Sequence, residues 1–166
     1  MITSQKKPLS VGKYVDTKHV DTVIRTYKQE RWVHNSDRIG KEDSLSAWYS
    51  VEELENFVDI IKQHGADGLK IYFAAYPEDF TEVPEYAGRQ TIVLVGTKRK
   101  ETENGKTVDK DIYIQTEKGS QILAYNMTKI CPPFCSGGGK DDSPIDWGEG
   151  LGITIVDRKD KGMVIV

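Results

Sequence analysis

The sequence predicts an α+β fold in which two N-terminal amphipathic helices pack on a mainly antiparallel sheet of five to six strands. Apolar residues recur at helical spacing in two segments before residue 65, and the spacing changes to alternation from residue 68. Turn residues such as Asn104-Gly105 then separate short apolar runs. Helices followed by consecutive strands are typical of the α+β class.

The first helix is expected to begin near Thr17 and to continue to about Trp32. Its apolar residues follow the i, i+3, i+4, i+7 pattern of one helical face. Residues 34–45 are polar and charged, which predicts a loop. The apolar face of the helix is formed by Val20, Val23, Ile24 and Tyr27.

The second helix carries the clearest local signal in the chain. Ser50 is a favourable N-cap residue, and Glu53 occupies the position that completes a capping box. Tyr49 before the cap and Leu54 after it are spaced as a hydrophobic staple. Gly65 is placed to end the helix.

Two strands and a long hairpin are predicted after this helix. Residues 69–75 alternate between the two faces of a strand, whereas residues 91–97 are apolar on both faces and suit a central strand. Asn104-Gly105 favours a two-residue type I′ turn, which would place Lys100 opposite Asp109. The same register would place Arg99 opposite a lysine, which counts against it. A further strand is expected at residues 121–126.

The ends of the chain differ from its middle. Residues 1–15 are polar and broken by proline and glycine, so we expect a disordered tail there and a single domain over residues 16–166. Glycines at residues 136–143 predict a flexible loop. Gly152–Val156 and Met163–Val166 are expected to form a C-terminal hairpin, whose last strand could leave an open edge that pairs with another copy.

Composition narrows the class of function. The chain has 166 residues and a formal net charge of −3, which is too small to indicate a nucleic-acid or membrane partner. The apolar runs are far shorter than the about 20 residues that a membrane-spanning helix needs. The N-terminus lacks the apolar stretch of a secretory signal, so we expect a cytoplasmic location. We expect the partner to be a protein or a small molecule that the sequence does not identify. The sequence does not indicate a cofactor.

The most distinctive motif is Cys131-Pro132-Pro133-Phe134-Cys135. The two cysteines could form a redox couple or half of a metal site. The prolines extend the chain, so the thiols meet only if it turns near Phe134. Zinc would need two more ligands, and the histidines show no paired spacing. We therefore favour a rigid turn with one or both cysteines packed, and keep a disulfide or metal link as the alternative.

Aromatic side chains offer a second candidate site. Tyr72, Tyr76 and Trp48 could line a ligand pocket or an interface, although packing in the core is the simpler interpretation. No nucleophile and base are spaced as a catalytic pair, so no catalytic residue is assigned. A non-enzymatic role is therefore favoured over an enzymatic one.

The order of these pieces resembles a group of small uncharacterised proteins common in Bacteroidetes bacteria. The resemblance implies a single domain and draws attention to the cysteine pair, but it implies no activity, substrate or catalytic residue. The matching segments are 50–61, 65–73, 91–96, 111–113, 122–126, the Cys-Pro-Pro-x-Cys element at 131–135, and Ser143-Pro144.

Two functions are carried forward from the sequence. The first is a non-enzymatic binding or protein-interaction module. The alternative is a redox or metal site organised by Cys131 and Cys135. An enzyme of unrecognised type is the third possibility.

Overall fold

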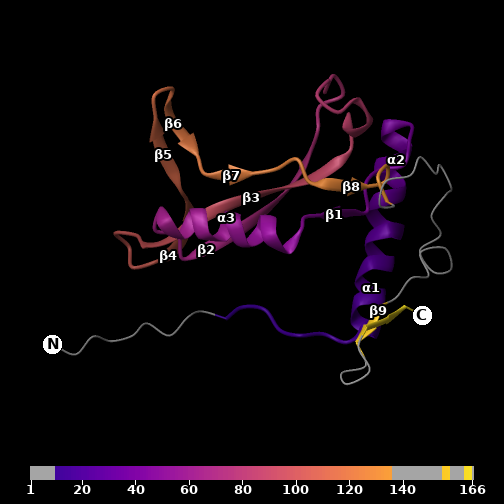
Figure 1. The fold of residues 1–166 in the computed structure, drawn as a ribbon, viewed down its shortest axis with the longest axis horizontal. Coiled ribbons are helices and arrows are strands. Elements are labelled where there is room, and N and C mark those ends of the chain that lie inside the picture. The colour runs from indigo at the N-terminus through magenta and orange to yellow at the C-terminus, as the bar shows by residue number, and fades with distance from the viewer. Residues whose placement is uncertain (1–9, 136–154, 158–162, 166) are drawn as a thin grey trace. The chain divides into compact units, whose positions relative to one another are not determined.

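The computed structural model describes residues 10–135, 155–157 and 163–165 (Figure 1). The chain divides into two compact units, residues 1–135 and residues 136–166, and each is described by itself. The first unit is α+β, as the sequence predicts. Most of the predicted tail and the whole of the predicted loop at 136–143 lie outside the described residues.

The first helical segment is longer than predicted. Helix α1 (Thr17–Tyr27), a π-helical stretch (Lys28–Trp32) and helix α2 (Val33–Ile39) follow one another without a break. The predicted loop at 34–45 is therefore wrong up to Ile39. Helical conformation ends only at Gly40, whose φ of 69° is left-handed and suits glycine. Because α2 is largely exposed, most of its residues are polar, and a polar segment of this kind resembles a loop in the sequence.

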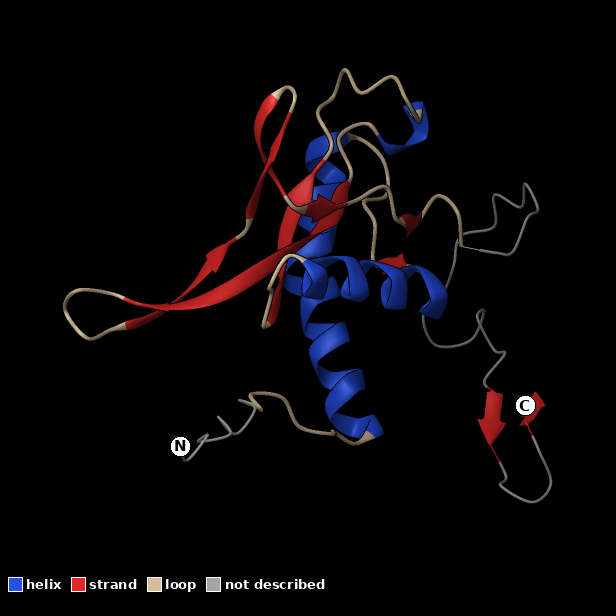
Figure 2. Cartoon of the chain, turned by 60° about the vertical axis from the view of Figure 1, so that its left-hand side comes forward, coloured by secondary structure: helices blue, strands red, loops and turns tan. Residues whose placement is uncertain are grey.

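Helix α1 leaves its apolar face uncovered. Val20, Val23 and Ile24 are exposed, and no residue of α1 is buried. Its last residue, Tyr27, is joined to the sheet by its hydroxyl, which donates a hydrogen bond of 2.6 Å to Gln90 Oε1. Figure 2 shows this helix extending past the strands. The predicted packing of the first helix on the sheet is therefore limited to its C-terminal part.

Helix α3 (Val51–Gln63) forms as predicted. Ser50 Oγ accepts a hydrogen bond from the Glu53 amide, and Glu53 Oε2 accepts one from the Ser50 amide, so the capping box is complete. Phe57 and Ile61 are buried beneath the helix. Gly65, with φ of 81°, follows its end.

The main sheet has four strands rather than five or six. Strand β2 (Gly68–Ala75) pairs with β3 (Gln90–Glu101), and β3 pairs on its other side with β4 (Thr107–Asp111) and β7 (Ala124–Tyr125). Antiparallel pairing and the central place of β3 agree with the sequence. The remaining described strands form small sheets, one of them between Ile112, whose amide donates to the Gly96 carbonyl, and Leu123, whose carbonyl accepts from the Gly96 amide.

Among the described residues, three two-stranded sheets account for the other strands. The predicted strand at 121–126 is interrupted, since β6 (Gly119–Ile122) ends before Leu123 and β7 begins at Ala124. The predicted C-terminal hairpin is present as a pair of antiparallel strands. The small sheets are β1 (Ser46–Trp48) with β8 (Lys129–Cys131), β5 (Tyr113–Thr116) with β6 (Gly119–Ile122), and β9 (Ile155–Asp157) with β10 (Met163–Ile165).

The β3–β4 hairpin differs from the predicted register by one residue. Arg99 lies opposite Asp109 instead of a lysine, and its Nε lies 3.0 Å from Asp109 Oδ1. Thr102 and Lys106 close a longer turn, in which the Thr102 amide donates to the Lys106 carbonyl. Gly105, with φ of 72°, takes the left-handed position of a three-residue loop. The shift pairs Arg99 with Asp109, and it places Lys110 opposite Lys98.

Two apolar clusters form the core. The first joins α3 to the sheet and contains Phe57, Ile61, Leu94 and Leu123. The second lies around the segment that connects β2 to β3 and contains Tyr76, Tyr86 and Ile130. Within the described ranges, no helix is long and apolar enough to cross a membrane.

Candidate functional site

Strand β2 has an open edge. In the described part of the chain, no strand pairs with the side of β2 that faces away from β3. The pairing with β3 runs without a bulge from Gly68, opposite Thr97, to Ala75, opposite Gln90. An unbroken strand of eight residues therefore presents unpaired backbone groups.

The hydrogen-bonding direction of each β2 residue follows from two backbone hydrogen bonds. The Tyr76 amide donates to the Arg89 carbonyl, which marks a hydrogen-bonded pair at one end of the ladder. The Gly96 amide donates to Leu123, away from β2, so its opposite residue Leu69 belongs to a non-bonded pair. Because bonded and non-bonded pairs alternate, the amides of Leu69, Ile71 and Phe73 point to the open edge.

The same three residues expose apolar side chains. Leu69 is 40% exposed, Ile71 is 53% exposed and Phe73 is 85% exposed. They share the face of the sheet that α3 covers, because Leu69 lies opposite Gly96 and Ile71 lies opposite Leu94. Helix α3 packs over β3 and leaves this part of β2 uncovered. Contiguous exposed apolar side chains mark interaction sites on soluble proteins.

The opposite face of β2 carries a polar cluster. Lys70 Nζ lies 2.7 Å from Asp111 Oδ1, and the Tyr72 hydroxyl donates a hydrogen bond of 2.6 Å to Asp111 Oδ2. The hydrogen bond from Lys70, followed by that from Tyr72, holds the pKa of Asp111 below its usual range. The contact with Asp111, followed by that with Tyr72, raises the pKa of Lys70.

The contact of Lys70 with Asp111 affects how well the open edge is protected from pairing. Edge strands are commonly protected from pairing by a charged side chain, often lysine. Lys70 is the single charged residue of β2, and its ammonium group is directed across the sheet to Asp111 on β4. The edge is therefore left without a free charge to oppose an incoming strand.

The three aromatic residues of the predicted ligand site differ in exposure and in their partners. Tyr72 belongs to the polar cluster on β2. Tyr76 is buried, stacks near Phe80 and places its hydroxyl 3.1 Å from Asn126 Oδ1. Trp48 is 59% exposed on β1, with Lys129 Nζ above its ring. The ligand site formed by these three side chains stays a prediction.

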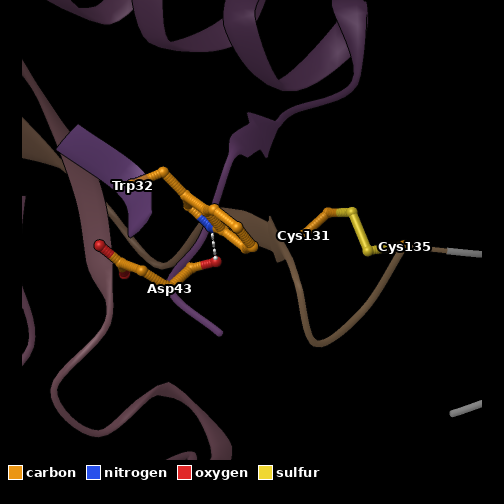
Figure 3. The surroundings of a disulfide bond; sticks show 4 residues. All are labelled: Trp32, Asp43, Cys131 and Cys135. Atoms are coloured by element: carbon orange, nitrogen blue, oxygen red, sulfur yellow. Dashed lines mark hydrogen bonds between the residues drawn. A yellow bond between two sulfur atoms is a disulfide. The ribbon is translucent and has the colours of Figure 1, made fainter. Parts of the chain in front are cut away.

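Cys131 and Cys135 are joined by a disulfide, with their Cα atoms 4.6 Å apart. The favoured interpretation of packed, unlinked cysteines is therefore wrong, because the chain turns within the motif and brings the sulfurs together. The Phe134 amide donates to the Ile130 carbonyl, which closes this turn. Figure 3 shows the indole of Trp32 beside the strand that carries Cys131. Joined sulfurs leave no thiolate for a metal, and the described residues include no cluster of metal ligands.

Asp43 is a buried, hydrogen-bonded residue that the sequence does not single out. Asp43 is 2% exposed, and its Oδ1 accepts hydrogen bonds from the amides of Ser44 and Gln90. Its carbonyl accepts the indole hydrogen bond of Trp32 at 2.7 Å (Figure 3). Asp43 lies in a polar segment beside Glu42, and nothing in that segment predicts that its carboxylate is buried. Nearby, burial lowers the pKa of Arg89, and the charge of Asp43 opposes that effect.

Comparisons with known proteins add no identity. A scan against family models, a search of curated proteins and a search of solved structures found no match. The resemblance to the Bacteroidetes proteins therefore stays a prediction.

Proposed function

We propose that this chain is a protein-interaction module that binds an extended strand at the open edge of β2. The observation that carries the proposal is the unpaired row of amides at Leu69, Ile71 and Phe73, next to their exposed apolar side chains. An incoming strand would gain backbone hydrogen bonds from the edge and apolar contact from the face. This combination is the basis of recognition by strand addition.

The pairing of Lys70 with Asp111 supports the proposal. A lysine whose charge is satisfied within the sheet offers little resistance to a new strand. Helix α1 supports it more generally, because Val20, Val23 and Ile24 form a second exposed apolar surface. Neither feature calls for catalysis, and the proposed role is non-enzymatic.

Binding of a model strand tests this proposal. The probe is a fluorescent peptide of alternating valine and threonine, titrated with the protein while anisotropy is recorded. We expect saturable binding that Ile71→Lys weakens at least about tenfold, because a charge is placed in the apolar face. Ile60→Lys is the matched control, since Ile60 on α3 is 46% exposed and lies outside β2. Absence of saturable binding, or equal loss in both variants, would contradict the proposal.

A second candidate function is redox chemistry at the disulfide. Cys131 and Cys135 are both partly exposed, so a dithiol reductant could reach them. Reduction would transfer two electrons and two protons to the disulfide and leave two thiols, while the reductant is oxidised to its own disulfide. The proposed cytoplasmic location requires such reversibility, because structural disulfides are rare in the cytosol.

Redox titration separates a reversible disulfide from a structural one. The protein is equilibrated in dithiol buffers of defined potential, alkylated and analysed by mass. A redox function predicts a midpoint inside the cytosolic range of about −220 to −320 mV. A disulfide that stays oxidised throughout that range would be structural and would point to an oxidising compartment instead.

A further inference from the structure

We infer that the strand bound at β2 is the β2 strand of a second copy of this chain, paired antiparallel about a two-fold axis at Ile71. The inference rests on the proposed function and names the partner. Pairing of this kind would join two four-stranded sheets edge to edge. It also uses one surface patch on both copies, as a two-fold interface requires.

The backbone of β2 is self-complementary about Ile71. The open amides belong to alternate residues, so a partner strand must present its own alternate residues opposite them. With the axis at Ile71, this residue faces the partner's Ile71, and Leu69 faces the partner's Phe73. Leu69, Ile71 and Phe73 then each meet an open position of the partner, and the ladder uses nearly the whole strand.

The side chains select this axis over its neighbours. An axis at Lys70 would pair only residues 68–72 of the two strands and so shorten the ladder. An axis at Ile71 places Lys70 opposite the partner's Tyr72. Lys70 Nζ already lies 5.3 Å from the ring centre of its own Tyr72, so its charge is compatible with this aromatic neighbour. An axis at Tyr72 would give a ladder of the same length, but it would leave Lys70 opposite Ala74, which offers its charge no aromatic neighbour.

The apolar face is also continued by a second copy. Leu69, Ile71 and Phe73 of each copy would lie on the same side of the joined sheet, so the exposed row of one strand extends into the row of the other. A single strand pair buries less than the about 800 Å² per partner of a typical stable complex. We therefore expect a dimer that forms and dissociates with protein concentration.

Sedimentation over about a hundredfold range of concentration tests the association. The mass is expected to rise from 18.7 kDa toward twice that value. Ile71→Lys should remain monomeric at every concentration, whereas Ile60→Lys should still dimerise. A wild-type chain that stays monomeric throughout would overturn the inference.

Disulfide trapping tests the register. The paired Ile71 positions would have Cα atoms about 5.5 Å apart, within the range that a disulfide spans. Ile71→Cys should therefore form a covalent dimer on oxidation. Phe73→Cys is the matched control, because each Phe73 would lie about 13 Å along the strand from its counterpart. Phe73 is more exposed than Ile71, so random collision would favour the control, and faster cross-linking of Phe73→Cys would overturn the proposed register.

These results separate the two proposals. Saturable binding of the valine–threonine peptide by a chain that stays monomeric would overturn the second-copy inference and leave the interaction module standing. A chain that neither dimerises nor binds the peptide would overturn both.

Discussion

Asp43 Oδ1 accepts the hydrogen bond of the Gln90 amide at 2.6 Å and so ties the segment after α2 to the first residue of β3. Ser44 continues the connection, because its hydroxyl donates to the Gln90 carbonyl. The long helix is thus held to the sheet by a buried acid. This connection fixes the start of β3, the strand with which β2 pairs.

Replacing Asp43 by alanine should destabilise the chain. The amides of Ser44 and Gln90 would lose their buried acceptor, and each unsatisfied donor costs about 1–3 kcal/mol. We expect a loss of about 2–4 kcal/mol in the free energy of unfolding, measured with urea. Asp43→Asn keeps one acceptor oxygen and should lose less than half as much. Equal stability of wild type and Asp43→Ala would contradict this account.

A methyl group at Gly96 should disturb the packing of α3 on β3. A Cβ atom at this position would lie 2.9 Å from Ile61 Cγ2. Overpacking of this kind typically costs about 1–3 kcal/mol. Gly96→Ala should therefore lower the thermal midpoint, whereas Gly12→Ala, which has nothing within 4 Å of the added carbon, should not. An unchanged midpoint for Gly96→Ala would show that α3 packs elsewhere.

Removal of the disulfide should cost stability without unfolding the main sheet. The closed segment of residues 131–135 is short, so chain entropy predicts a loss of about 2 kcal/mol in Cys131→Ser/Cys135→Ser. The same change should follow when the wild type is treated with a strong dithiol, while the double variant should not respond to it. A response of the double variant to reductant would assign the effect to another cause.

The pH dependence of stability should report the Asp111 cluster. Because the pKa of Asp111 is lower in the folded chain than in the unfolded chain, its contribution is complete above about pH 4 and is lost as the pH falls through the folded pKa. The difference in stability between wild type and Asp111→Asn should therefore shrink below about pH 4. The exposed Asp79, changed to asparagine, serves as the control. A difference that is constant across this range would contradict the assignment.

Local signals predicted the elements whose stability is local. The capping box at Ser50 and Glu53 depends on residues three apart, and it forms as the sequence indicates. Alternation over residues 69–75 likewise identified β2. The register of the β3–β4 hairpin was missed by one residue, because Asn104-Gly105 suits both a two-residue and a three-residue turn. Each register pairs Asp109 with a basic residue, so cross-strand charge does not distinguish them in the sequence.

Nonlocal contacts explain what could not be predicted. The burial of Asp43 depends on Gln90, which is distant in sequence, and periodicity contains no information about such a pair. The open edge of β2 depends on strand order, which a strand pattern does not specify. Tyr72 and Tyr76 were grouped by their spacing, yet one lies on a partly exposed sheet face and the other in the core. The disulfide depends on a turn at Pro132 and Pro133, where the sequence predicts extended backbone.

Residue-resolved hydrogen exchange of β2 tests the open edge most directly. In dilute protein, the amides of Leu69, Ile71 and Phe73 should exchange faster than those of Lys70, Tyr72 and Ala74, because only the latter are bonded to β3. Saturation with the valine–threonine peptide should slow the first set and leave the second unchanged. Uniform exchange along β2, or a peptide that protects neither set, would contradict the claim that this edge is an interaction surface.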